Sequence, residues 1–229
     1  MSLAFIGIAG ILLLLAALFF LNMPVGFAMG IVGFLGFCHI VSFQAGLNMV
    51  GSAVWDTFSR YGLTVIPLFI FMGQIAFHCG VNERLYNAAY KWVGHIRGGI
   101  AMSTILACSA FSAICGSNVA TAATMSTVAL PQMKKYRYHP KLSTGTVASG
   151  STLGVVIPPS VVLIVIGIST EQSIARLFYG SVGAGLLLAL LMMGVVALIC
   201  RRHPDWGPAG PAVGWEERFA ALSGATEMM

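Results

Sequence analysis

The sequence predicts an all-α integral membrane protein, and three observations support this fold class. Hydrophobic residues make up 58% of the 229 positions and charged residues 8%, roughly a third of the charged fraction of a soluble domain. Apolar residues collect in runs near the roughly 20 residues that a helix needs to cross a membrane. Two of the later runs are broken, at residues 116–121 and 150–160. We therefore expect about five transmembrane helices, one re-entrant helical hairpin and one broken helix.

Residues 1–98 are predicted to form scaffold helices and an interfacial amphipathic helix. Apolar spans cover residues 3–21, 25–41 and 63–79. Residues 42–62 between them predict an interfacial loop with a short helix. In residues 81–97, apolar side chains recur at helical spacing with charged ones between them, which predicts an amphipathic helix at the membrane surface. We interpret this helix as a strut, and the alternative is a docking surface for another subunit.

Residues 99–168 are predicted to carry a transport site. The arms at residues 99–115 and 119–133 flank the first break, and at 1.5 Å per residue each reaches only about 22 to 26 Å. Because this length falls short of the hydrocarbon core, a re-entrant helical hairpin fits better than two crossings. The following helix begins near Leu142, breaks over residues 150–160 and then resumes.

Residues 169–203 contain the final span, and residues 204–229 are rich in proline and glycine, which predicts a cytoplasmic linker tail leading into further protein. The two faces of this topology differ in basic residues, ten against two. The less basic face carries Arg60 and Arg176. By the positive-inside rule, we expect the hairpin mouth and the tail to be cytoplasmic and the N-terminus to be periplasmic.

The two breaks contain the elements of a cation site. A helix interrupted at membrane depth frees backbone carbonyls, and oxygen atoms are the ligands that hard cations such as Na⁺ prefer. Gly116 permits the first turn, and Pro158 and Pro159 remove two N–H donors from the second. The candidate sodium- and substrate-binding residues are Gly116, Ser117, Asn118, Thr121, Gly150, Ser151, Thr152, Gly154, Pro158, Pro159 and Ser160.

Acidic residues are missing from every predicted span. The carboxylates of the chain are Asp56, Glu83, Glu171, Asp205, Glu216, Glu217 and Glu227. A proton pump would usually carry an acid inside the membrane, so coupling to Na⁺ through neutral ligands outranks coupling to protons. The positive ends of the helices that begin near Val119 and after Ser160 suit an anionic substrate group.

Other functions are less consistent with the sequence. The five cysteines show no paired CxxC spacing, and no cluster of metal-ligating residues appears beyond the expected Na⁺ site. The chain also offers no nucleophile and base pair, so we do not expect an enzyme. Small and hydroxylated residues are common where membrane helices pack. The alternative function is therefore a truncated or split scaffold that packs with a partner subunit and does not transport.

Four motifs are distributed along the chain: MPVGFA at residues 23–28, IPLF at 66–69, GSNVAT at 116–121 and LGVVIPPS at 153–160. Together they resemble the large, DctM-like membrane subunit of tripartite ATP-independent periplasmic (TRAP) transporters over residues 3–206. Asn118 departs from the family pattern, which often has a second serine there. The resemblance implies that the chain is the N-terminal half, one of two inverted repeats, with a missing C-terminal repeat as its partner.

The resemblance also implies an elevator mechanism in the bacterial inner membrane, in which the hairpin and the broken helix carry substrate and Na⁺ past a fixed scaffold. It implies a small TRAP membrane subunit and a periplasmic substrate-binding protein as partners. The implied substrates are organic acids: a dicarboxylate, a keto acid, a sialic acid or a sugar acid. The Na⁺ site is then expected between the hairpin tip and the second break.

Overall fold

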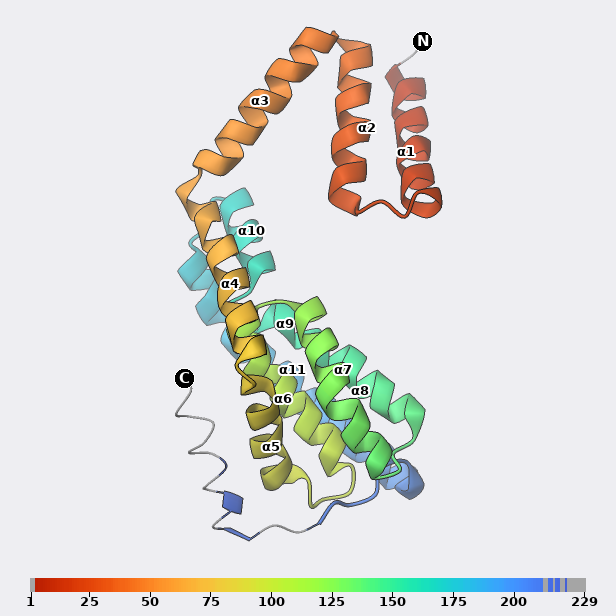
Figure 1. Cartoon of the computed structure of the whole chain (residues 1–229), viewed down its shortest axis with the longest axis vertical. Coiled ribbons are helices and arrows are strands. Elements are labelled where there is room, and N and C mark those ends of the chain that lie inside the picture. Colours follow the sequence, from red (N-terminus) through yellow and green to blue (C-terminus); the bar gives the residue numbers. More distant parts are fainter. Residues whose placement is uncertain (1–2, 212–213, 216, 219–220, 222–229) are drawn as a thin grey trace. The chain divides into compact units, whose positions relative to one another are not determined.

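The computed structural model describes residues 3–211, 214–215, 217–218 and 221, and every regular element in these residues is helical (Figure 1). The chain divides into two compact units, Met1–Tyr61 and Gly62–Met229.

Apolar helices occur in both units of the chain. Two stretches, Pro140–Ser169 and Ile174–Arg202, are long and apolar enough to cross a membrane. The shorter apolar helices are Phe5–Phe20, Val25–Ile40 and Gly99–Cys115. The predicted all-α membrane fold is confirmed, whereas the number of crossings and the re-entrance of the hairpin stay predictions.

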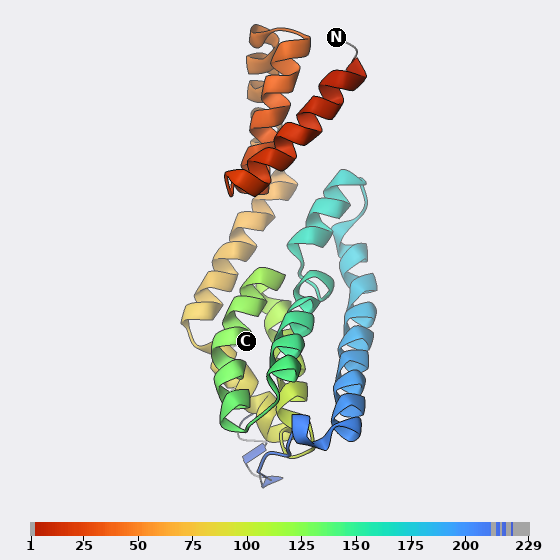
Figure 2. The same cartoon turned by 90° about the vertical axis from the view of Figure 1, so that its right-hand side faces the viewer.

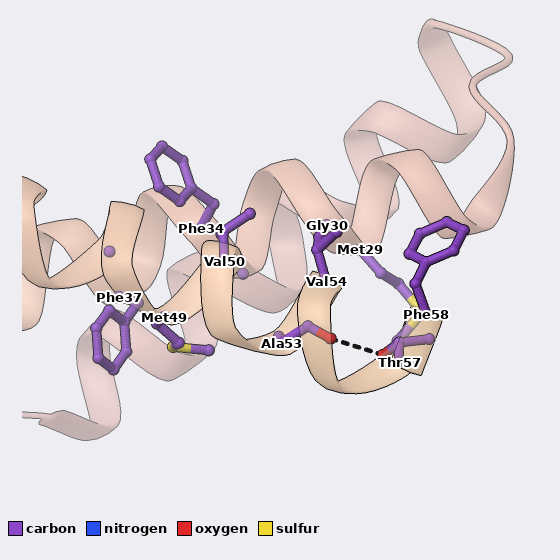
Figure 3. A pocket seen from close by; sticks show the side chains of 12 residues that line it. Met29, Gly30, Phe34, Phe37, Met49, Val50, Ala53, Val54, Thr57 and Phe58 are labelled. Carbon is purple, nitrogen blue, oxygen red and sulfur yellow. Dashed lines mark hydrogen bonds between the residues drawn. The ribbon is translucent and has the colours of Figure 1, made fainter. Parts of the chain in front are cut away.

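The first unit contains three helices, α1 (Leu3–Phe20), α2 (Val25–Ile40) and α3 (Phe43–Ser59). Pro24 directly precedes α2 with a ψ of 136°, so the chain is not helical between α1 and α2. A cavity of about 390 Å³ lies between α2 and α3, and Figure 3 shows its apolar lining. Thr57 supplies the one hydroxyl in that lining, and it donates to the carbonyl of Ala53 at 2.7 Å.

The prediction of an interfacial loop with a short helix over residues 42–62 underestimates the helix, because α3 fills most of this range. Ser42 caps the helix by accepting a hydrogen bond from the Ala45 amide at 3.2 Å. The hydroxyls of Ser52 and Thr57 donate to carbonyls of the same helix. Polar side chains that are satisfied in this way do not interrupt a helix, so a polar composition alone was a poor sign of a loop.

The second unit is built around α6 (Gly99–Cys115). Its other helices are η1 (Tyr61–Thr64), α4 (Val65–His78), α5 (Val81–Val93), α7 (Asn118–Lys135), α8 (Pro140–Ser151), α9 (Leu153–Val156), α10 (Val161–Ser169), α11 (Ile174–Arg202) and η2 (Pro204–Trp206). The helix α6 packs against α4, α5, α7, α8 and α11, and its side chains Ile100, Ile105, Cys108 and Phe111 are buried. Figure 2 shows α8 beside the α6–α7 hairpin and beside α11.

The helix α5 has the amphipathic pattern predicted for residues 81–97, although it ends at Val93. Leu85, Tyr86 and Ala88 are buried, and the helix packs against α6. Glu83 lies on the exposed side. The apolar face of α5 therefore belongs to the protein interior, and its position at a membrane surface stays a prediction.

The chain after α11 is packed against the second unit and is not a free linker, which corrects the prediction for the start of residues 204–229. The Trp206 ring stacks on His139 with centroids 4.3 Å apart. The carbonyl of Gly207 accepts from the Gly98 amide at 2.9 Å, and that of Trp206 accepts from the His139 amide at 3.0 Å. We call residues 203–210 the tail segment. Most of the predicted linker beyond it lies outside the described residues.

Candidate functional site

The first break forms the tip of the α6–α7 hairpin. Gly116 ends α6 with a φ of 58°, and its amide donates to the Ser112 carbonyl at 2.9 Å. Ser117 is extended and caps α7 by accepting from the Ala120 amide at 3.4 Å. Glycine is favoured at such a left-handed position because it has no Cβ. The local sequence thus reverses the chain within two residues.

The second break separates α9 from α10. Ile157 is extended after the last residue of α9, and Ser160 is extended before the first residue of α10. Pro158 and Pro159 lie between them, joined by a cis peptide bond. Because the prolines have no N–H group, the helix cannot continue through them.

The two breaks contact each other through their backbones. A Cβ placed on Gly116 would collide with the carbonyl oxygen of Pro159, and the Val161 amide donates to the Gly116 carbonyl at 3.5 Å. A Cβ placed on Gly154 would lie only 2.8 Å from the Asn118 amide nitrogen. The structure therefore brings the hairpin tip together with Gly154, Pro159 and the start of α10.

Four helix ends meet at this contact. At the tip, α6 ends and α7 begins; at the second break, α9 ends and α10 begins. The first amides of a helix and its last carbonyls have no partners within the helix, and they carry partial positive and negative charge respectively. The contact therefore combines the positive ends of two helices with the negative ends of two others.

Several predicted ligand side chains are already hydrogen-bonded to the backbone. The hydroxyl of Thr121 is fully buried and donates to the Ser117 carbonyl at 2.8 Å. Ser151 donates to Ala148 at 2.9 Å, and Thr152 donates to the carbonyl three residues before it at 2.6 Å. The amide oxygen of Asn118 accepts from the Val119 amide at 2.8 Å. These side chains shape the breaks locally.

Gly150, Ser151 and Thr152 lie away from the tip contact. A Cβ placed on Gly150 would face Cys108 of α6, with the Cys108 Sγ at 3.2 Å. None of the three residues lines the cavity beside the tip. Gly150 and Ser151 are buried at the end of α8, which packs against α6, and Thr152 is exposed.

Three buried hydroxyls near the tip have no hydrogen-bond partner among the described residues. They belong to Ser112, Thr124 and Ser160, which are 0%, 2% and 0% exposed. Ser112 lies one turn before Gly116, and Thr124 lies two turns into α7. The sequence analysis identified Ser160 and missed the other two. They could have been found from the sequence because they lie one and two helical turns from the first break. Buried polar groups without partners are rare, so these oxygens mark a place where a ligand is expected.

A cavity of about 540 Å³ lies beside the tip, bounded by α4, α6, α7, α9 and α10. Gly116, Ser117, Asn118 and Thr124 line it. Gln74, an amide within the largely apolar helix α4, also lines it. The sequence analysis missed this residue. No aspartate, glutamate, histidine, lysine or arginine is among the described residues of its lining. The cavity therefore combines neutral oxygen atoms with helix ends.

The fold and this site define a class: an all-α membrane protein in which two interrupted helices meet at their breaks, as in many secondary transporters. Residues 12–229 match the family model of the tripartite ATP-independent periplasmic transporter, DctM component. The chain therefore belongs to this family, which confirms the resemblance predicted from the motifs.

The curated relatives of this chain are named for different transported substrates. The chain is 38% identical over 168 residues to the C4-dicarboxylate TRAP transporter large permease DctM of Pseudomonas aeruginosa, covering 73% of this chain and 39% of that one. It is 31% identical to the sialic acid permease SiaM of Vibrio cholerae, covering 81% and 43%. It is 30% identical to the ectoine/5-hydroxyectoine permease UehC of Ruegeria pomeroyi, covering 93% and 50%. The chain thus spans half or less of the length of these relatives.

Proposed function

We propose that this chain forms part of the membrane permease of a Na⁺-coupled secondary transporter that imports an organic acid. The observation that carries the proposal is the contact between the hairpin tip and the second break, where Ser112, Thr124 and Ser160 keep unpartnered hydroxyls. The fold then serves to hold four helix ends around a transported ion and its substrate.

Coupling to Na⁺ is supported by the neutral oxygen atoms of the site. Hard cations bind hydroxyl and carbonyl oxygens. Thr124 lines the tip cavity, Ser160 directly precedes α10 at the second break, and Ser112 lies one turn before Gly116. An acid that could take up a proton is not among the described residues of the cavity lining. In this proposal Ser112, Thr124 and Ser160 supply side-chain ligands, and Gly116 and Pro159 supply backbone carbonyls.

Binding of an organic anion is supported by the two helices that begin at the contact. Both α7, with 18 residues, and α10, with 9 residues, start there. The amides of Val119, Ala120 and Val161 already donate to protein oxygens, so the support comes from the positive dipole ends of the two helices, which favour a carboxylate. Asn118 and Gln74 add neutral side-chain donors at the cavity wall.

The assembly that we propose follows from the relatives. Their names assign C4-dicarboxylate, sialic acid and ectoine to TRAP large permeases, so a carboxylate-containing substrate is the common chemistry. The chain would act in the bacterial inner membrane with a second repeat, a small membrane subunit and a periplasmic binding protein. The hairpin and the broken helix would move together as the carrier of an elevator.

Uptake by proteoliposomes tests this function. The chain is reconstituted with its second repeat, its small subunit and its binding protein, and uptake of a radiolabelled dicarboxylate or sialic acid is measured with and without an inward Na⁺ gradient. We expect gradient-dependent uptake in the unmodified assembly. We also expect Ser112→Ala to raise the Na⁺ concentration that gives half-maximal uptake.

Ser109→Ala is the matched control, because Ser109 lies on the same helix and its hydroxyl already donates to the Ile105 carbonyl at 2.8 Å. This variant should leave the Na⁺ dependence unchanged. Equal substrate uptake with and without the Na⁺ gradient would contradict the proposed coupling to Na⁺. An assembled complex that takes up neither substrate under any gradient would favour the alternative, a scaffold that does not transport.

A further inference from the structure

A third cavity, of about 440 Å³, forms a groove between α8 and α11 with α6 behind it. Leu188, Leu191, Met192 and Val195 of α11 line one wall. Gly145 of α8 lines the opposite wall, and a Cβ placed there would meet nothing within 4 Å. Leu191 and Val195 remain 58% and 55% exposed. The groove is therefore apolar, open along its length and separate from the cavity at the hairpin tip.

One end of the groove has the side chains of a membrane interface. Lys141 and Trp206 line it there, and Arg201 and Arg202 follow within one turn of the lining residue Ile199. All three basic side chains are exposed, and Asp205 is the one carboxylate in residues 172–211. Tryptophan and basic residues concentrate where lipid headgroups lie, so this end fits an anionic headgroup.

The length of the groove fits one leaflet. From Ile199 to Leu188 the wall of α11 extends about 16 Å at 1.5 Å per residue, close to half of the roughly 30 Å hydrocarbon core. The apolar length of the groove therefore matches the acyl chain of a lipid in one leaflet.

We propose that this groove binds a phospholipid with an anionic headgroup. One acyl chain lies between α8 and α11, and the phosphate lies beside Lys141 and the last turn of α11. Each basic residue near an anionic lipid surface contributes about 1 kcal/mol, and the apolar walls are available for van der Waals packing with the acyl chain. This site does not depend on the transport proposal, since it shares no lining residue with the tip cavity.

Photo-crosslinking tests the site directly. The full chain, purified from membranes, is incubated with phosphatidylglycerol that carries a diazirine on one acyl chain, and labelled peptides are identified by mass spectrometry. We expect label on residues 142–149 and 188–199. Unlabelled phosphatidylglycerol should compete, whereas phosphatidylcholine and soluble glycerol phosphate should not. Lys141→Gln should weaken labelling about fivefold, and Lys134→Gln, on the last turn of α7, should not.

Gly145→Phe is the decisive variant, because a Cβ at Gly145 meets nothing within 4 Å and Gly145 lines the groove that the acyl chain would occupy. It should abolish labelling of the groove while the protein remains folded. Gly180→Phe is the matched control, since Gly180 is an exposed glycine of α11 with the same open space and no place in the groove. Three results would overturn the proposal: label that persists in Gly145→Phe, equal competition by phosphatidylcholine, or competition by soluble glycerol phosphate.

Discussion

At the base of the α6–α7 hairpin, backbone hydrogen bonds join the tail segment to the residue before α6 and to the residue before α8, whereas at the tip two interrupted helices meet near hydroxyls without partners. The base includes the bonds from Gly98 to Gly207 and from His139 to Trp206. The tip includes Ser112, Thr124 and Ser160. The base of the hairpin is therefore held by backbone hydrogen bonds, whereas the tip has buried hydroxyls without hydrogen-bond partners.

This difference separates stability from function within one structural element. Satisfied backbone groups and a stacked tryptophan stabilise the base. Buried oxygen atoms without partners cost free energy at the tip, and such a cost is expected where a ligand supplies the missing interaction. Changes at the base should therefore alter folding, and changes of tip hydroxyls should alter ion coupling.

The largest loss of stability is expected from Gly116→Ala at the tip. The left-handed backbone costs about 1 to 2 kcal/mol for a residue with a Cβ, and the new methyl group would collide with the backbone of Pro159. We expect a total cost of about 3 kcal/mol and loss of substrate uptake. Unfolding in mixed micelles and uptake by proteoliposomes measure the two effects.

Gly80→Ala is the control for Gly116→Ala. Gly80 has a similar φ of 72°, but a Cβ there would meet nothing within 4 Å. It should show the backbone cost alone. Equal losses of stability in the two variants would show that the tip and the second break are not in contact.

A smaller loss is expected from Gly98→Ala at the base. Gly98 has a φ of 75°, and its added Cβ would lie 2.6 Å from the Cys200 Sγ. Because a side chain moves more easily than a backbone, we expect about 2 kcal/mol in the free energy of unfolding. The double variant with Cys200→Ala should recover part of this loss. Uptake per folded molecule should stay normal. A loss of uptake without a loss of folded protein would contradict the proposal that the base serves stability and the tip serves transport.

Tyr138→Phe should cost less, about 1 to 2 kcal/mol. The Tyr138 hydroxyl accepts from the Ile100 amide at 3.2 Å and donates to the Pro208 carbonyl at 2.9 Å, so it ties the hairpin base to the tail segment. Tyr179→Phe, at a residue that is 84% exposed on α11, should be neutral by the same unfolding measurement.

The same tyrosine gives the base an alkaline pH dependence. Burial raises the pKa of Tyr138 from 10.0 to about 12, against the lowering effect of the bond from Ile100. The folded state therefore holds the proton more tightly than the unfolded state. Its contribution to stability is complete below pH 10 and is lost as the pH rises through about 12. Tyr138→Phe should lack this component of the pH profile, and an unchanged profile would contradict it.

The sequence predicted the breaks well because glycine and proline act on the local backbone. The predicted arm over residues 99–115 matches α6, and the proline pair ends the helix where expected. Local patterns could not reveal that Gly116 contacts Pro159, since this contact depends on packing between distant segments. Ser112 and Thr124 were missed because they lie inside regular helices, where most hydroxyls bond to their own backbone. The tail segment was missed because proline and glycine also permit close packing.

The smallest effect on stability is expected from Thr124→Val, and it separates the two ends of the hairpin most cleanly. The Thr124 hydroxyl is buried without a partner, so replacing it with a methyl group should leave the free energy of unfolding unchanged or slightly raised. If this oxygen binds Na⁺, the variant should nevertheless need a higher Na⁺ concentration for half-maximal uptake. Thr127→Val on the same helix is the control, because the Thr127 hydroxyl already donates to the Thr124 carbonyl at 2.7 Å. Normal Na⁺ dependence in the Thr124→Val variant would show that the Thr124 hydroxyl is not a Na⁺ ligand.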